Sequence, residues 1–423
     1  MQQNKPITLR RNFSWTFIGN VIYSGCQWGM LVVLAKLGSP EMVGQFTLGL
    51  AVTAPIMMFT NLQLRIVQAT DVKQQFLFSD YLALRLISTG LALLTITIIS
   101  FFSGYGGEIS LVIFLIGVAK TFEAISDIFC GLIQQHERMD RIAISLMIKG
   151  PLSLLLLGIG VYLSGRVSWG VLGLIFTWVV VLFSYDIRSG LLIIKQRSKL
   201  QPRWHKKSLI KLTWLSLPLG FVMMLISFNA NIPRYFIERY LGVRELGIFA
   251  ALAYLMVAGG MVINALGESA IPRLAKYYAE GNHKAFRNLL LKLLGIATVL
   301  GGIGVLVAVI GGRPILTLLY RPEYGEQTTL FICLMVVAGI NYMSSFLGYA
   351  MTAARYFRMQ IPLFMTVASI SGIACFWLLP KLGLLGGAVA LLLGSITQLI
   401  ISVGVIIYIL YKLQKYENSK SAA

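Results

Sequence analysis

Long apolar runs separated by short polar breaks fill the chain from end to end. Each run is long enough for a helix that crosses a hydrocarbon core about 30 Å thick, which needs roughly 20 apolar residues. The ten-residue alternating segments of a transmembrane β-barrel do not occur in the sequence. The pattern therefore predicts an all-α, polytopic membrane protein with about twelve transmembrane helices, centred on 12–36, 46–69, 80–102, 109–133, 142–164, 169–194, 212–240, 247–270, 288–311, 328–352, 359–379 and 384–411.

A short turn-like phrase occurs twice, each time between two long apolar runs. The first copy reads LGSPEMVGQF (37–46) and the second reads LGVRELGIF (241–249). When Phe46 is placed on Phe249, Gly44 meets Gly247. A second similar pair, HERM at 136–139 and YFRM at 356–359, falls between the fourth and fifth run of each half. These recurrences indicate a duplicated chain.

The duplication predicts how the helices are organised. With six runs in each copy, the two copies have the same orientation, which is a parallel repeat about an axis along the membrane normal. We expect two parallel six-helix lobes around a central cavity, and such lobes can rock to open the cavity to either side in turn. The expected domains are an N-terminal lobe over 1–195, a basic cytoplasmic linker over 196–211 and a C-terminal lobe over 212–423.

Composition and charge support a membrane protein and give its orientation. Hydrophobic residues make up 57% of the 423 residues and charged residues 12%, which excludes an ordinary soluble domain. Most of the net charge of +20 lies in alternate short loops and at the ends of the chain. Because loops rich in Lys and Arg stay in the cytoplasm, both termini are expected to be cytoplasmic. Membrane insertion and anionic lipid explain the basic charge, so no nucleic acid is expected as a partner.

The stretch LAKLGSPEMVGQFTLGLAV at the end of the first run, with its LG-x-x-E-x-(x)-G-x-F turn repeated in the second half, resembles a known family. It is similar to the Wzx-type oligosaccharide flippases of polysaccharide biosynthesis. Their superfamily also contains the multidrug-and-toxin extruders and the lipid II flippases. The resemblance covers essentially the whole chain. It implies transport of a lipid-linked oligosaccharide across the cytoplasmic (inner) membrane of a bacterium.

Ionisable residues inside the apolar runs are the candidate functional residues, because charges in the bilayer are costly. On the fourth run Lys120, Glu123 and Asp127 share one helical face. Lys120 and Glu123 can neutralise each other, and we expect Asp127 to find a partner in Arg85 or Lys149. Two interpretations remain open at this point: a structural ion network within one lobe, or the lining of a cavity for a polar substrate.

The seventh and eighth runs carry the candidates of the second half. Asn229, Asn231 and Arg234 lie around a proline in SFNANIPRYFIERYLG. They either line a cavity, or Arg234 extends to the outer surface beside a tolerated kink. Glu268, near the cytoplasmic end of the eighth run, is expected to pair with Arg273 or with Arg65.

The first run contains no carboxylate, whereas cation-coupled drug extruders of the superfamily typically carry one there. This departure disfavours the first alternative function, a cation-coupled multidrug extruder. A second alternative is a membrane glycosyltransferase or polysaccharide polymerase. It is disfavoured because the outer loops are short, the three histidines are scattered, and the sequence has no DxD or phosphate-binding motif. No enzyme activity, cofactor or metal is therefore expected.

The sequence thus predicts a flippase for a polyprenyl-pyrophosphate-linked oligosaccharide that works by alternating access and serves O antigen (lipopolysaccharide), capsule or exopolysaccharide assembly. Expected partners are the lipid-linked oligosaccharide, membrane lipids, and the polysaccharide polymerase with its chain-length machinery. The predicted proton or gate sites are Glu123, Asp127 and Glu268. The predicted substrate cavity is lined by Arg85, Lys120, Lys149, Asn229, Asn231 and Arg234.

Overall fold

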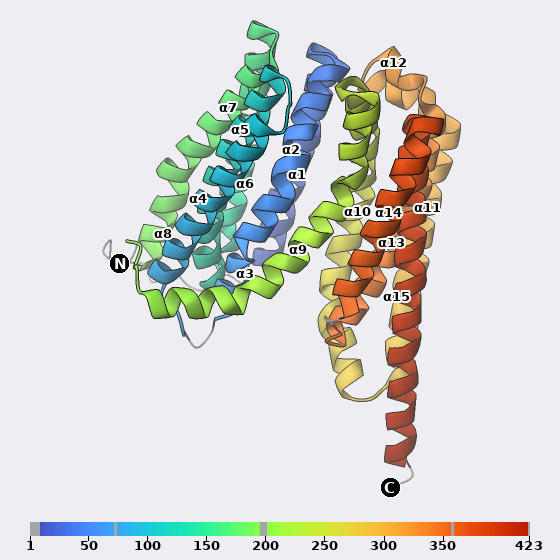
Figure 1. Cartoon of the computed structure of the whole chain (residues 1–423). Coiled ribbons are helices and arrows are strands. Elements are labelled where there is room, and N and C mark those ends of the chain that lie inside the picture. Colours follow the sequence, from blue (N-terminus) through green and yellow to red (C-terminus); the bar gives the residue numbers. More distant parts are fainter. Residues whose placement is uncertain (1–8, 72–73, 195–200, 357–358, 422–423) are drawn as a thin grey trace. The chain divides into compact units, whose positions relative to one another are not determined.

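The computed structural model describes residues 9–71, 74–194, 201–356 and 359–421, and every regular element in these ranges is a helix (Figure 1). Twelve of the helices are long and apolar enough to cross a membrane. The prediction of an all-α, multi-pass membrane protein with about twelve spans is confirmed. The chain divides into two compact units, Met1–Ser227 and Phe228–Ala423.

The first unit contains six candidate spans and the first part of a seventh. Its second span is broken into α2 and α3, and its sixth is a continuous run of α7, the π-helix η1 and α8. Residues 195–200, which fall at the start of the predicted linker, lie outside the described ranges. The helices are α1 (Leu9–Leu37), α2 (Pro40–Asn61), α3 (Leu64–Ala69), α4 (Phe78–Phe102), α5 (Gly107–Gln135), α6 (Met139–Ser164), α7 (Val167–Val181), η1 (Leu182–Asp186), α8 (Ile187–Ile194) and the start of α9 (Lys206–Leu241).

The beginning of α9 belongs to the first unit by its packing. Leu212 is fully buried in an apolar cluster with Leu62, Leu64 and Tyr81. Gly220 comes so close to the end of α2 that an added Cβ would lie 2.6 Å from the carbonyl oxygen of Phe59. The division between the two units therefore falls within α9, at Ser227.

The second unit consists of the rest of α9 and five further spans. Two of its helices, α10 and α11, have 37 residues each and are about 55 Å long at 1.5 Å per residue, well beyond the hydrocarbon thickness. They continue past the predicted runs 247–270 and 288–311. The helices are α10 (Val243–Ala279), α11 (His283–Leu319), α12 (Pro322–Gly325), α13 (Thr328–Ala353), α14 (Gln360–Leu382) and α15 (Leu384–Ser421).

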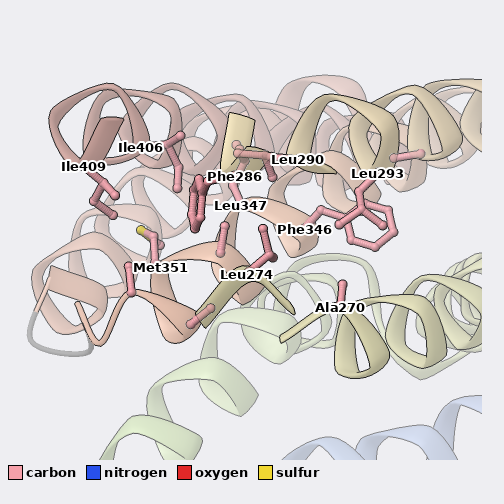
Figure 2. Close-up of a cluster of buried hydrophobic side chains, with 14 of the residues drawn as sticks. Ala270, Leu274, Phe286, Leu290, Leu293, Phe346, Leu347, Met351, Ile406 and Ile409 are labelled. Carbon is pink, nitrogen blue, oxygen red and sulfur yellow. The ribbon is translucent and has the colours of Figure 1, made fainter. Parts of the chain in front are cut away.

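An apolar core holds these long helices together where α10 turns into α11 (Figure 2). Leu274 of α10 and Phe286 of α11 are fully buried there, together with Ile409 of α15 and Met351 of α13. The region combines this core with exposed basic side chains, among them Lys276. The core therefore continues into the parts of α10 and α11 that lie beyond the predicted apolar runs.

Both copies of the repeated phrase form tight connections between antiparallel helices. In the first copy α1 ends at Leu37, and the Ser39 side chain caps α2 by accepting a hydrogen bond from the Met42 amide. In the second copy the chain turns at Gly242, whose φ of 90° suits glycine, between α9 and α10. The phenylalanine of each copy is buried in its own unit. The phrase therefore has the same structural role twice.

Candidate functional site

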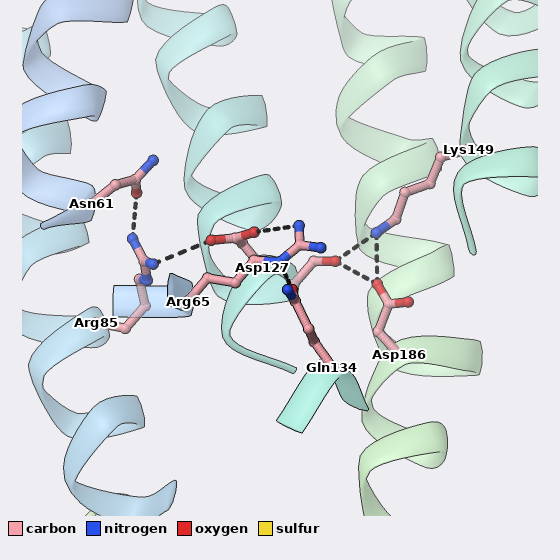
Figure 3. A network of polar contacts seen from close by, with 8 residues as sticks. Asn61, Arg65, Arg85, Asp127, Gln134, Lys149 and Asp186 are labelled. Atoms are coloured by element: carbon pink, nitrogen blue, oxygen red, sulfur yellow. Dashed lines mark hydrogen bonds and ion pairs between the residues drawn. The ribbon is translucent and has the colours of Figure 1, made fainter. Parts of the chain in front are cut away.

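Two arginines surround one carboxylate inside the first unit (Figure 3). Asp127 on α5 accepts from Arg65 Nη1 at Oδ1, at 3.2 Å, and from Arg85 Nη2 at Oδ2, at 3.4 Å. Arg65 Nε also donates to Gln134 Oε1 at 2.9 Å, and Arg85 Nη1 donates to Asn61 Oδ1. We call these five residues the arginine cluster. It joins the end of α2 to α3, α4 and α5.

A break in the second span positions the arginine cluster. Leu62 and Gln63 have φ values of 51° and 50°, in the left-handed region that residues other than glycine rarely adopt. Because the helix is interrupted there, Asn61 ends α2 and Arg65 lies in the first turn of α3. At the matching place in the second unit, α10 runs on without interruption. The break is therefore a feature of the first copy alone.

The arginine cluster carries an excess positive charge. Two guanidinium groups share the single carboxylate of Asp127. The Arg85 side chain is 1% exposed, whereas those of Arg65 and Asp127 are 33% and 31% exposed. The cluster thus has a buried side, fixed by Arg85, and an accessible side. The prediction that Arg85 is a partner of Asp127 is confirmed.

Lys120 and Glu123 form a separate pair on α5. Lys120 Nζ lies 2.5 Å from Glu123 Oε2, and about a third of each side chain is exposed. The predicted mutual neutralisation is confirmed. Because the pair is neutral, it adds no net charge to the region.

The prediction that Lys149 is a partner of Asp127 is wrong. Lys149 Nζ instead lies 2.7 Å from Asp186 Oδ2, and both side chains are almost completely buried. Ser126 and Asp127 are consecutive on α5, so their side chains point about 100° apart and bond to different neighbours. Ser126 accepts a hydrogen bond from Lys149, whereas Asp127 faces the arginines (Figure 3). The rotation of α5 therefore separates the two clusters.

In the second unit the predicted residues of α9 lie together. Arg234 Nη1 donates to Asn231 Oδ1 at 2.7 Å, and Asn231 is 4% exposed. Asn229 Nδ2 donates to the carbonyl oxygen of Phe364 on α14 at 2.9 Å. Within the described part of the chain, no carboxylate lies within 4.0 Å of the Arg234 guanidinium. Arg234 is therefore a cation inside a span that has no acidic partner among the described residues.

Glu268 is exposed on α10. One of its two predicted partners, Arg65, is bonded to Asp127 instead. The neighbouring Asn264 accepts a hydrogen bond from the Tyr349 hydroxyl at 3.1 Å. Among the described residues, Glu268 forms no ion pair with Arg65 or with Arg273.

Sequence reasoning missed Asn61, Arg65 and Gln134 of the arginine cluster, and Asp186, the acidic partner of Lys149. A signal existed for Asp186, which is an ionisable residue within the predicted run 169–194. Arg65 lies within the run 46–69 and was treated as a partner for Glu268. No pattern in the sequence marks Asn61 or Gln134, because their role depends on which helices face each other.

The chemistry of these residues suits an anionic ligand. In the described ranges no three His, Cys, Asp or Glu side chains are arranged to hold a metal ion. The cations not neutralised one for one by a carboxylate among these residues are the guanidinium groups of Arg65, Arg85 and Arg234. These bind carboxylate or phosphate oxygens through paired, charge-assisted hydrogen bonds.

Comparison with solved structures assigns the fold. An inward-facing multidrug resistance MATE family transporter of the MOP superfamily matches with a TM-score of 0.74 at 13% identity, over 95% of this chain and 99% of that one. The lipid II flippase MurJ, in an inward closed conformation, matches with a TM-score of 0.69 at 13% identity, over 94% of this chain and 89% of that one. The protein therefore has the fold of MOP-superfamily transporters.

The sequence itself belongs to the polysaccharide biosynthesis protein family, whose profile matches residues 9–278. A similar curated protein is the capsular polysaccharide biosynthesis protein CapF of Staphylococcus aureus, which is 29% identical over 393 residues. The match spans 92% of this chain and 97% of CapF. The family resemblance predicted from the repeated turn is confirmed.

Proposed function

We propose that the protein is a flippase that moves a polyprenyl-pyrophosphate-linked oligosaccharide from the inner to the outer leaflet of a bacterial cytoplasmic membrane. Two observations support the substrate class. Family membership connects the chain to polysaccharide biosynthesis, and the fold is shared with membrane transporters. The duplicated six-helix pattern supports alternating access, in which the two lobes rock about a cavity between them.

The observation that carries the proposal is the excess of guanidinium groups in the spans. Arg65 and Arg85 share one carboxylate, and Arg234 has no acidic partner among the described residues. In a medium of low dielectric constant this excess is strongly attractive to an anion. A pyrophosphate offers several anionic oxygens in the geometry that guanidinium groups bind. The head group of a lipid-linked sugar therefore matches the charge of the site.

Within this proposal each predicted residue has a definite role. Arg65 and Arg234 bind the pyrophosphate, Arg85 holds Asp127 from the buried side, and the polyprenyl chain stays in lipid. Before the substrate binds, the carboxylate of Asp127 occupies the guanidinium groups of the arginines. The substrate anion then replaces this carboxylate, and Asp127 thereby acts as a gate partner. Lys149 is left out of the substrate contacts, because its ammonium is buried and already bonded within the first unit.

The remaining predicted residues have secondary roles in the proposal. Asn231 orients Arg234, and Asn229 ties α9 to α14 near the sugar path. Lys120 and Glu123 present a neutral polar pair, about a third exposed, to the sugars. Glu268, which is exposed on α10, is the proposed proton or gate site of the second unit.

The cellular setting follows from the same proposal. Both termini lie in the cytoplasm in this proposal, and the distribution of Lys and Arg in the loops supports that orientation. The product, a repeat unit facing outward, is what a polysaccharide polymerase with its chain-length machinery consumes. The relative CapF is named for capsular polysaccharide, which favours a capsule over O antigen or exopolysaccharide as the polymer.

A reconstituted flipping assay tests the proposal. Purified protein is placed in vesicles that contain a polyprenyl-pyrophosphate oligosaccharide, and the fraction of head groups accessible to a membrane-impermeant sugar oxidant is followed with time. Arg65→Gln and Arg234→Gln should each slow flipping about tenfold, the loss expected for one charge-assisted hydrogen bond. Lys276→Gln is the matched control, because Lys276 is an exposed cation paired with Glu280 at 3.8 Å. No flipping by the unaltered protein would overturn the proposal.

A further inference from the structure

The buried pair Lys149 and Asp186 belongs to a small, fully bonded cluster within the first unit. Asp186 Oδ2 lies 2.7 Å from Lys149 Nζ and 2.6 Å from the hydroxyl oxygen of Ser126, which donates to it. Asp186 Oδ1 accepts from the hydroxyl of Ser145 at 2.6 Å. Lys149 also donates to Ser126 Oγ. The four residues come from α5, α6 and η1.

The environment of the Lys149 ammonium is complete. An ammonium has three N–H donors. Two of them reach Asp186 Oδ2 and Ser126 Oγ, and the Trp178 ring covers the ammonium at 4.8 Å from the ring centre. An aromatic face attracts a cation. A carboxylate, a hydroxyl and an aromatic face thus surround one positive charge.

The surrounding helices are shaped to build this environment. Asp186 is the last residue of the π-helix η1, and such insertions into an α-helix commonly occur at functional sites. Tyr23 of α1 packs edge-on against Trp178, with ring centres 6.3 Å apart. Beside Lys149, Gly150 lets α6 approach α1 so closely that an added Cβ would lie 3.2 Å from the Tyr23 Cα. The helices α1, α6 and α7 therefore pack closely around the cluster.

We propose that Asp186 and Ser126, with Ser145 orienting the carboxylate and the Trp178 ring facing the bound cation, form a monovalent-cation site that the Lys149 ammonium occupies permanently. The acceptor atoms are oxygens, which also bind free alkali ions. One positive charge neutralises the single carboxylate. A divalent ion would leave an uncompensated charge in a buried place, which is costly. Without the lysine side chain, a sodium ion fits the charge and the ligands of the site.

This assignment has a consequence for transport that rests on the proposed function. Because the cation is covalently part of the chain, it cannot be exchanged during a transport cycle. Any ion that drives flipping therefore acts elsewhere in the molecule than at Asp186.

The test is thermal denaturation of purified protein in detergent, in sodium chloride or in N-methyl-D-glucamine chloride at equal ionic strength. The unaltered protein should have the same Tm in both salts. Lys149→Ala should have a lower Tm in the glucamine salt and recover several degrees, saturably, as sodium replaces it. Lys120→Ala is the matched control, because Lys120 is bonded to one carboxylate on the same helix and should show no sodium-specific recovery.

The double variant Lys149→Ala with Asp186→Asn separates the site from general instability. It should be indifferent to sodium and more stable than Lys149→Ala in the glucamine salt, because no buried charge is left unpaired. Two results would overturn the proposal. One is a folded Lys149→Ala protein that sodium does not stabilise. If Lys149→Ala does not fold, the same conclusion follows when sodium fails to restore its fold although the double variant folds. The other is saturable sodium binding by the unaltered protein that Asp186→Asn abolishes. Neither readout depends on flipping, so the flipping assay can fail independently.

Discussion

At the scale of single residues, the pairing of each intramembrane charge decides what it can do. Arg85 and Lys149 are both almost fully buried, and each is matched by a carboxylate within the first unit. Arg65 shares the carboxylate of Asp127 but remains a third exposed. Arg234 bonds to the amide of Asn231. In the proposed function, Arg85 and Lys149 are therefore structural, whereas Arg65 and Arg234 bind the anionic ligand.

Replacement of Asp127 by Asn should destabilise the first unit. The buried guanidinium of Arg85 would lose its carboxylate, and breaking a fully buried pair costs about 3–5 kcal/mol. Because the Asp127 side chain is partly exposed, water compensates in part, and we expect a loss of about 2 kcal/mol. The measurement is the shift of Tm relative to Glu123→Gln, which breaks the more exposed pair with Lys120 and should cost less. Equal Tm shifts for the two variants would contradict the expectation that the more buried ion pair contributes more to stability.

At the scale of elements, the break between α2 and α3 distinguishes the two copies. Leu62 and Gln63 adopt positive φ values that cost free energy for residues with a side chain. The break places Arg65 next to Asp127. The helix α10 is continuous at the equivalent position and has no such break. Strained backbone and excess charge thus occur together, as is typical of functional sites.

A glycine in the strained position should relieve the strain. Gln63→Gly is expected to stabilise the protein by up to about 1 kcal/mol, because glycine adopts positive φ without steric cost. Ile66→Gly, three residues away on the exposed face of α3, should destabilise it by about 1 kcal/mol, because its φ lies in the helical region. Thermal denaturation of both variants checks the pair. A lower Tm for Gln63→Gly than for Ile66→Gly would show that the left-handed backbone at Gln63 is not strained.

The extended ends of α10 and α11 depend on their own core. Phe286 is fully buried among apolar side chains of α10, α13 and α15. We expect Phe286→Ala to lower the free energy of unfolding by about 3 kcal/mol, the usual result of removing a buried aromatic side chain. Leu291→Ala, on the exposed face of the same helix at 57% exposure, should leave the Tm nearly unchanged. Limited proteolysis near Ala279–His283 reports the same difference locally, and equal digestion of both variants would argue against this core.

At the scale of the whole molecule, the protein is a duplicated bundle whose copies have diverged. The repeated turn has the same role in both units, but the second span is broken in one and continuous in the other. The two units also differ in their intramembrane ion pairs. The charge excess of the arginine cluster fits the anionic head group of the proposed substrate.

The orientation of the chain can be measured directly. In intact cells, Arg166→Cys, in the connection between α6 and α7, should react with a membrane-impermeant maleimide. Lys207→Cys, at the start of α9, should react only after the cells are permeabilised. The native cysteines lie within candidate spans and are not strongly exposed, so the unaltered protein is the control and should remain unlabelled. The reverse pattern would place both termini outside the cell.

The sequence alone determined the class of the protein. Backbone groups in lipid must be bonded within their own segment, so long apolar runs can only be helices, and their number follows from their length. The duplicated turn likewise revealed the family. Pairing of charges across helices is different, because it depends on the rotation and depth of each helix, which packing sets. For that reason the partners Lys120 and Glu123, close in the chain, were predictable. The bond of Lys149 to Asp186, the sharing of Asp127 by two arginines and the break at Leu62 were decided only by the tertiary structure.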